Sequence, residues 1–314
     1  MSEGLAAVRA AAVGAAGRDR LDTRRKLQLA LSAAWLFDGL LQYQPAMFSK
    51  SFPQMLAGSA AGNPAPVAAP IVWSATFIGH HLVISNGVFA TIQVLLGLGI
   101  AWRPTVKAAL AASVVWSAGV WWLGEGLGGI LTGSLSPLAG APGAVVLYAL
   151  LAVLLWPADR HPAAPFVAAR AVGTRVAQAS CLILWGTMAV LALLSGIRAP
   201  GALSDSVLAM SHGQPGWLAW LDARFADALA GHGLAASIVL AVLLLAVAVG
   251  PWRAALTLTR AALVLAIALA MIFWLAEGTG GVLTGTATDP NTGPLLILIA
   301  VAFWPLRVST AKEG

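Results

Sequence analysis

Charged residues are scarce in this chain of 314 residues: they make up 10% of it, against 59% hydrophobic residues. An ordinary soluble domain carries about a quarter charged residues. The chain also has a single cysteine, Cys181, which excludes an intrachain disulfide and a paired-cysteine metal site. These shortages exclude a soluble enzyme, a disordered chain, a collagen and a disulfide scaffold. The sequence also lacks a P-loop, a zinc HExxH helix and a serine nucleophile elbow.

Long apolar runs dominate what remains. Eight runs, several of them near 20 residues, are long enough to cross a hydrocarbon core about 30 Å thick. We therefore expect an all-α, polytopic integral membrane protein with eight transmembrane helices. The expected spans cover residues 27–48, 71–102, 106–126, 141–157, 176–197, 232–251, 254–277 and 293–306.

The basic residues predict how these spans are oriented. Of the 18 Lys and Arg residues, only Lys50, Arg198 and Arg224 fall on one side of the expected membrane, and the other 15 fall on the opposite side. Cytoplasmic loops are enriched in Lys and Arg. We therefore expect a multi-pass protein of the plasma membrane (the bacterial inner membrane) with both termini in the cytoplasm. This topology accounts for the net charge of +6 without a nucleic-acid partner.

The strongest pattern in the chain is an internal repeat. Residues 122–133 read WLGEGLGGILTG and residues 274–285 read WLAEGTGGVLTG, with nine of 12 positions identical. In each copy a histidine, His80 or His232, precedes the glutamate of the motif by 45 residues. We therefore expect two four-helix repeats. Because each contains an even number of spans, both should have the same, parallel orientation in the membrane.

This repeat divides the chain into five parts. They are a basic cytoplasmic arm (1–26), a first membrane repeat (27–157), a cytoplasmic linker (158–175), a second membrane repeat (176–306) and a cytoplasmic tail (307–314). The copies differ in their first spans, because aligning Trp35 with Trp185 sets Asp38 opposite Met188. We infer that the first half keeps the polar site and that the second half is mainly architectural.

Glu125 and Glu277 are the first candidate site residues, and a glycine-rich segment follows each of them. A rise of 1.5 Å per residue from the inner helix ends brings both near the outer membrane boundary. Glycine permits backbone shapes that other residues resist, so a helix could break beside the carboxylate and line an outward-facing cavity. Alternatively, each acid pairs with a histidine or a basic residue at an ordinary helix end. Both interpretations stay open.

His80 and His232 are the next candidates, because they are expected at the same depth as the glutamates. A histidine beside a carboxylate can relay protons. If the pseudo-symmetry axis brought the two histidines together, they could instead be axial ligands of a haem. A buried, hydrogen-bonded histidine at a helix end is the alternative. No metal site is predicted.

Asp38 is expected near the middle of the first span, where an acid costs about 2.5–3.5 kcal/mol on insertion scales. It must be paired, protonated or exposed to a water-filled space, and we favour a functional role. Asn86 and Gln93 lie seven residues apart in the second span and continue one face through Ala90 and Gly97. That stripe predicts close helix packing with interhelical hydrogen bonds.

The segment WLFDGLLQYQPAMF, from the first span into a polar stretch, resembles the opening of DoxX/DoxD-type membrane proteins, as does the size of the four-helix unit. The element EGxGGxLTG is similar to one in uncharacterised bacterial membrane proteins of this general kind. DoxX/DoxD-type proteins are small four-span proteins, some of them associated with quinone-reducing thiosulfate oxidation or membrane-bound redox complexes. The resemblance implies a redox role but assigns no catalytic residue, and the fused eight-span form departs from the family.

These observations favour a membrane component of a redox system that engages a quinone or a similar small partner near the outer leaflet. Its protons would be handled by the candidate residues Asp38, His80, Glu125, His232 and Glu277. A quinone is the cofactor this interpretation needs, a membrane redox protein is its partner, and haem has to be tested. Two alternatives stay open: a transporter or channel for a small solute or ion, and a non-catalytic membrane scaffold.

Overall fold

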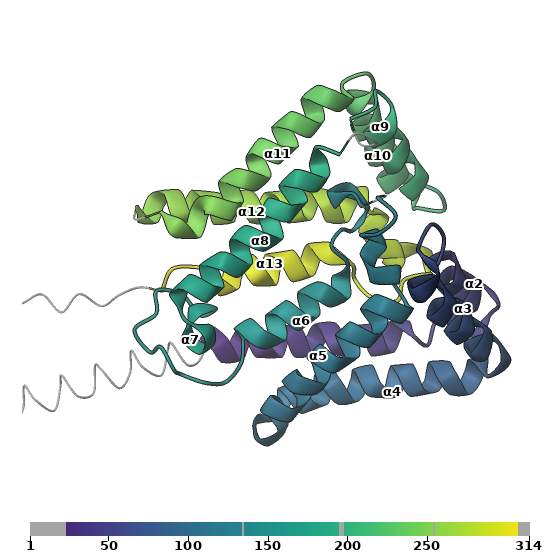
Figure 1. The fold of residues 1–314 in the computed structure, drawn as a ribbon, viewed down its shortest axis with the longest axis horizontal. Helices are drawn as coiled ribbons and strands as arrows, with labels where there is room; N and C mark the ends of the chain where they lie inside the picture. The colour runs from purple at the N-terminus through teal and green to yellow at the C-terminus, as the bar shows by residue number, and fades with distance from the viewer. Residues whose placement is uncertain (1–22, 134, 195–197, 254, 307–314) are drawn as a thin grey trace, which may run out of the picture.

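The computed structural model describes residues 23–133, 135–194, 198–253 and 255–306. Every regular element within these ranges is a helix, so the predicted all-α class is confirmed (Figure 1). The predicted tail and most of the predicted N-terminal arm lie outside the described residues.

The first helix covers residues 23–41 and is purple in Figure 1. It is followed by α2 (Ser51–Gly58), α3 (Ala65–His80), α4 (Leu82–Ala101), α5 (Val106–Leu123), α6 (Ala144–Leu154) and α7 (Ala169–Val172). The rest of the chain forms α8 (Thr174–Ala192), α9 (Ala202–Met210), α10 (Gly216–Leu229), α11 (Gly233–Val249), α12 (Leu256–Ala276) and α13 (Thr292–Ala302). Short 3-10 segments lie between them: η1 (Pro45–Phe48), η2 (Arg103–Thr105), η3 (Gly126–Gly129), η4 (Pro137–Ala139), η5 (Gly250–Trp252) and η6 (Gly278–Thr284).

Five helices in the described part of the chain are long and apolar enough to cross a membrane: α4, α5 with η2, α8, α11 with η5, and α12. The apolar helices α6 and α13 have only 11 residues each. At 1.5 Å per residue they reach about 16 Å, roughly half of a hydrocarbon core. The apolar helices indicate a lipid bilayer as the environment of this protein.

The second predicted span, residues 71–102, is corrected by the structure. The helical path breaks at His81, which has φ −124° and ψ 36°, so α3 and α4 are separate helices. The break follows Gly79 and the polar pair His80-His81, and the His81 N–H closes α3 by donating to the carbonyls of Phe77 and Ile78. α3 packs against α2 instead of prolonging α4 (Figure 1).

The centre of the molecule is formed by the two short helices, because α6 packs against α13 while α5 covers α6 and α12 covers α13 (Figure 1). Their facing side chains, including Leu151 and Leu295, are fully buried. On the first helix, Trp35 stacks against Tyr148 of α6 with ring centroids 4.1 Å apart. The stripe on α4 that was predicted to pack is buried, and Ser32 on the first helix donates to the carbonyl of Gly97 (2.6 Å).

The linker over residues 158–175 is packed against one end of the bundle, on the left of Figure 1. Its Asp159 pairs with Arg24 of the first helix at 2.6 Å and with Arg170 at 3.5 Å. The neighbouring Arg25 donates to the carbonyl of Ile100 (2.9 Å) and to that of Ala101, which closes the end of α4. The opposite end of the bundle carries α2, α3, α9 and α10.

Candidate functional site

The two repeated motifs adopt the same backbone conformation. Beyond Glu125 the chain makes a left-handed turn, with φ between 57° and 75° over residues 126–129. Beyond Glu277 it does so again, with φ between 54° and 75° over residues 278–281. A left-handed backbone costs a residue with a side chain about 1–2 kcal/mol. The turn therefore explains why three of its four positions are glycine in each copy.

The first turn brings Glu125 to the start of α6. The Glu125 carboxyl accepts a hydrogen bond from the backbone N–H of Val145, in the first turn of that helix. Its Oε2 atom lies against Gly143 and has no hydrogen-bond partner among the described residues. Any side chain at position 143 would collide with the carboxyl, so glycine at this position leaves the space that the Glu125 carboxyl occupies.

The second turn brings Glu277 to the start of α13. Its Oε1 atom accepts a hydrogen bond from the Thr292 hydroxyl at 2.8 Å. The carboxyl also accepts from the backbone N–H groups of Thr292 and of Gly140, which lies in the loop before α6. Glu277 is 4% exposed. It thus caps a short helix as Glu125 does, and it also ties the two halves of the chain together.

A third carboxyl, Asp289, lies within electrostatic reach of both glutamates and was not predicted from the sequence. It is fixed by the backbone N–H of Asn291 (2.7 Å) and by the hydroxyl of Thr288 (3.0 Å). Asp289 is close enough to raise the proton affinity of both Glu125 and Glu277. The segment TDPN reads as an ordinary turn before a helix, so only the fold reveals that this acid joins the site.

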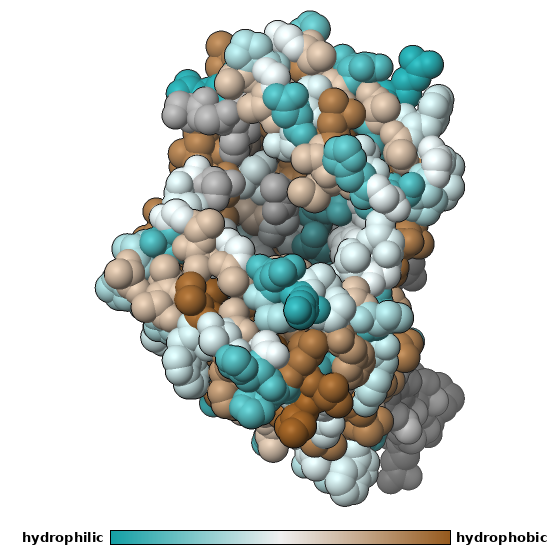
Figure 2. Space-filling view, turned by 90° about the vertical axis from the view of Figure 1, so that its right-hand side faces the viewer, coloured by the Kyte–Doolittle hydropathy of each residue, from teal (hydrophilic) through white to brown (hydrophobic). Residues whose placement is uncertain are grey.

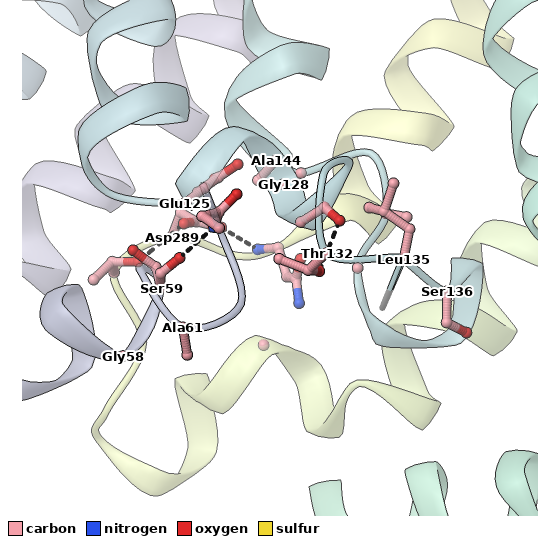
Figure 3. A pocket seen from close by; sticks show the side chains of 18 residues that line it. Gly58, Ser59, Ala61, Glu125, Gly128, Thr132, Leu135, Ser136, Ala144 and Asp289 are labelled. Carbon is pink, nitrogen blue, oxygen red and sulfur yellow. Dashed lines mark hydrogen bonds between the residues drawn. The ribbon is translucent and has the colours of Figure 1, made fainter. Parts of the chain in front are cut away.

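A cavity of about 560 Å³ lies beside these groups. Its walls come from the end of α2, the first left-handed turn, the loop before α6 and the loop before α13 (Figure 3). The polar side chains that line it belong to Ser59, Asn63, Glu125, Thr132, Ser136, Thr288, Asp289 and Asn291. Figure 2 shows the end of the molecule that carries α2 and α9, with a hollow in its middle and hydrophilic residues at the floor.

The described residues that line the cavity supply acidic and neutral hydrogen-bonding groups. Glu125 and Asp289 supply carboxyls, while amides, hydroxyls and the backbone of several glycines supply hydrogen-bonding groups. Among the described residues that line the cavity there is no Lys, Arg or His and no aromatic side chain. A ligand would therefore meet hydrogen-bonding groups and carboxyls that can release a proton, but no cation and no aromatic ring to stack on among these residues.

Burial sets the protonation of the acids around the cavity. It raises the pKa of Glu125 to about 8, and the neighbouring Asp289 carboxyl adds to this effect. Burial likewise raises the pKa of Glu277 to about 8, against the opposing effect of the Thr292 hydroxyl. The pKa of Asp289 is raised by burial, although its bonds from Asn291 and Thr288 lower it. Both glutamates can therefore exchange protons near neutral pH.

Asp38, the acid predicted in the first span, lies behind the cavity and does not line it. It is 1% exposed, and its Oδ1 atom has no hydrogen-bond partner among the described residues. Its carboxyl lies beside the phenol of Tyr148 and within electrostatic reach of Asp289. The end of the first helix is tied to the loop of Asp289 by Gln44, whose Nε2 donates to the carbonyl of Ala287 at 3.2 Å.

The two predicted histidines are not brought to this site. His80 ends α3, His232 precedes α11, and both are exposed. Within the described residues, no hydrogen bond or ion pair joins either of them to Glu125 or Glu277, because each glutamate is held at the start of a short helix. The turns that carry the histidines lie at separate corners of Figure 1, lower right and top. This arrangement does not support a haem held between them.

A second pair of matching turns flanks the site. Gly62-Asn63-Pro64 joins α2 to α3, and Gly213-Gln214-Pro215 joins α9 to α10, with φ 74° and 76° at the two glycines. Gly126 packs against the end of the first turn, at Ser59 and Asn63. Gln214 of the second turn donates to the carbonyl of Gly278 at 2.8 Å. The Gly-Asn-Pro and Gly-Gln-Pro segments were the sequence signal that would have matched α3 to α10.

α10 also differs in one respect from its prediction. The sequence favours a short amphipathic surface helix with an apolar face formed by Trp217, Leu218, Leu221, Phe225 and Leu229. The helix forms and Leu218 is buried, but Asp222 is buried as well and Trp217 is 60% exposed.

No family model matches the chain, and no curated protein or solved structure is significantly similar to it. The resemblance to DoxX/DoxD-type proteins therefore stays a prediction. Within the described residues, no group of three or more His, Cys, Asp or Glu side chains is placed to hold a metal ion. The function has to be inferred from the cavity and its carboxyls.

Proposed function

We propose that the protein is a membrane transporter for a small polar solute that is neutral or positively charged. The observation that carries this proposal is the lining of the cavity, which offers the Glu125 and Asp289 carboxyls and no cationic side chain among its described residues. A volume of about 560 Å³ is in the usual range of small-molecule sites. An anion would find no cationic partner among these described residues and would be repelled whenever the two acids are ionised.

The short helices support transport over simple binding. In many transporters the solute site is formed by discontinuous helices whose ends lie at the site within the membrane. Here α6 and α13 are short, and both begin beside the cavity. The segments that precede them are loops where a full-length span would be helical. Non-helical backbone at membrane depth is tolerated only where protein buries it or where it lines a cavity.

We further propose that the chain is a tandem duplication of one four-helix unit, with both units in the same orientation and both termini in the cytoplasm. The order of the elements supports this: the first helix, α4, α5 and α6 match α8, α11, α12 and α13. The glutamate turns and the flanking Gly-Asn-Pro and Gly-Gln-Pro turns recur at corresponding places. The uneven distribution of Lys and Arg supports the orientation and a plasma-membrane location.

A redox role with a quinone has less support from the geometry. That interpretation relied on histidine–glutamate pairs, and the histidines are exposed and away from the carboxyls. No aromatic side chain is present among the described lining residues to contact a quinone ring. A purely structural scaffold would have no use for a polar cavity, although the glutamates would still cap α6 and α13.

Uptake into proteoliposomes tests the transport proposal. The panel includes amines, zwitterions, neutral polyols and inorganic cations, with organic anions as the class expected to fail. Wild-type protein should accumulate at least one neutral or cationic solute. Glu125→Gln should lower that uptake about tenfold, because an amide can neither release a proton nor form the charged hydrogen bond that the ionised carboxyl offers to a solute.

Glu277→Gln is the matched control, because Glu277 occupies the same turn in the second half but does not line the cavity. It should keep most of the uptake. No protein-dependent uptake of any neutral or cationic solute by folded, monodisperse protein would contradict the proposal. So would uptake that is equally insensitive to both substitutions.

A further inference from the structure

We propose that Asp38 is an inner proton-binding site, present in the first half only, that exchanges its proton with the cavity by way of Asp289. This inference goes beyond the proposed transport, because it assigns a proton carrier behind the solute cavity. It stands on the placement of three side chains that come together from distant parts of the sequence: Asp38, Tyr148 and Asp289.

The first step is the state of Asp38 itself. Its carboxyl is 1% exposed, and Oδ1 has no hydrogen-bond partner among the described residues. None of the ion pairs in the described part of the chain includes it. An ionised carboxylate in such surroundings is too costly to persist, so the group must be neutralised.

The second step is what can neutralise it. The ionisable groups that face Asp38 are the phenol of Tyr148 on α6 and the Asp289 carboxyl from the loop before α13. Neither is a cation. On α4, the neighbouring Asn86 is fully buried and donates to the carbonyl of Gln42 at 2.6 Å. A group of acids suitable for a metal ion is absent from the described residues. With no cationic side chain facing it in the described part of the chain, Asp38 is neutralised by a proton.

The third step is the route of that proton. Asp289 lines the cavity, where it meets solute and water, and it also lies within electrostatic reach of Asp38. The transfer balances as an exchange between two carboxyls: Asp38 first releases its proton to the Asp289 carboxylate, and a proton on an oxygen of Asp289 then adds to Oδ1 of the ionised Asp38. Asp289 is left as the carboxylate and regains a proton from the cavity.

The second half has no equivalent site. Aligning Trp185 with Trp35 sets Met188 opposite Asp38, and both tryptophans are buried. The fifth residue of α6 is Tyr148, whereas the fifth residue of α13 is Leu296. Met188 is 1% exposed and Leu296 is fully buried, so apolar side chains fill the corresponding positions. The proton site should therefore occur once per molecule.

Acid-minus-alkaline infrared difference spectra of the protein in lipid vesicles, recorded without solute, test the proposal. The wild-type spectrum should contain the C=O stretch of a protonated carboxylic acid that shifts in D₂O. This band should be lost in Asp38→Asn and kept in Glu277→Gln. In Asp289→Asn it should remain, but its exchange with D₂O should be several-fold slower.

Tyr148→Phe provides a second variant in case Asp38→Asn does not fold. It should move the frequency of the Asp38 band without removing it, because it takes away the neighbouring phenol. A spectrum that is the same in wild type and Asp38→Asn would overturn the proposal, as would an exchange rate that Asp289→Asn leaves unchanged. Since no solute is present, failure of the uptake assay would leave this result intact, and the two proposals can fail separately.

Discussion

Glu125 and Glu277 show how two opposing effects act on one side chain. The start of a helix favours a negative charge, typically by less than 1 kcal/mol. Burial disfavours that charge more strongly, and the nearby Asp289 carboxyl adds repulsion. The balance leaves both glutamates able to hold a proton near neutral pH.

The raised pKa values predict how stability depends on pH. In the folded protein, Glu125 and Glu277 keep their protons up to about pH 8. The unfolded chain releases them at the ordinary glutamate value, about 4.3. Between these limits the unfolded state binds fewer protons, so the free energy of unfolding falls as the pH rises. The unfolding temperature in detergent should therefore decrease from about pH 5 to about pH 8 and level off above that.

Glu277→Gln keeps the neutral shape of the side chain and removes its titration. It should reduce the slope of unfolding temperature against pH over the same interval, measured by differential scanning fluorimetry. An unfolding temperature that increases with pH in wild type would contradict this explanation.

Depth and repetition in the sequence pointed to three acids that the structure places at or near the cavity. The duplicated motif identified Glu125 and Glu277, and the cost of an acid inside a span identified Asp38. Asp289 was missed because it lies in a loop of the second half and has no counterpart in the first. The predicted pairing of His80 with Glu125 is not found, because equal depth in a membrane does not bring two side chains together.

At the level of elements, the left-handed turns determine where the carboxyls lie. Each turn reverses the chain beyond a long helix and carries a glutamate to the start of a short one. The sequence indicated that something unusual follows α5 and α12, because so many glycines cluster there. It could not indicate the hand of the turn, which depends on what each glycine packs against. The break between α3 and α4 was missed for a similar reason, since a continuous apolar run conceals it.

Gly280 tests the need for these turns. A Cβ atom there would lie 2.7 Å from the Cβ of Asn291, and the residue has φ 66°. Gly280→Ala should cost about 1–2 kcal/mol for the backbone and about 1–3 kcal/mol for the collision. Chemical denaturation in detergent measures the loss.

Alanine substitutions at two other glycines distinguish the backbone cost of Gly280→Ala from the cost of its collision with Asn291. Gly231 has φ 72° with nothing within 4 Å of its Cβ position, so Gly231→Ala should show the backbone cost alone. Gly119 lies in α5 with open space around it, and Gly119→Ala should leave stability unchanged or slightly higher. Equal losses for Gly280→Ala and Gly231→Ala would show that the packing against Asn291 does not matter.

For the whole molecule, composition and periodicity were enough to predict an all-helical membrane protein. The count of spans depends on more than apolar length, because α6 and α13 begin only after Pro-Gly and Pro-Asn pairs and are therefore short. A repeat is recognisable in the sequence at the glutamate motif. Elsewhere the matching turns and the order of the helices are what support the proposed duplication.

The proposed orientation in the membrane predicts which residues can be labelled from outside the cell. Lys50 directly precedes α2, Arg160 lies in the linker before α7, and both are exposed. The helices α2 and α7 lie at opposite ends of the fold (Figure 1). With the buried Cys181 replaced by serine, Lys50→Cys should react with a membrane-impermeant maleimide in intact cells. Arg160→Cys should react only after the membrane is permeabilised. The reverse pattern would place the cavity on the cytoplasmic side.

The central claim is that the cavity beside Glu125 and Asp289 binds a neutral or cationic polar solute. The most direct test is the unfolding temperature of the purified protein with each solute of the uptake panel. A solute present at about 100 times its dissociation constant should stabilise the protein by about 2.7 kcal/mol. We predict that at least one amine, zwitterion, polyol or inorganic cation stabilises the wild type, and that Glu125→Gln abolishes the effect while Glu277→Gln retains it. Stabilisation by anions or quinones alone, or stabilisation that persists in Glu125→Gln, would contradict the account.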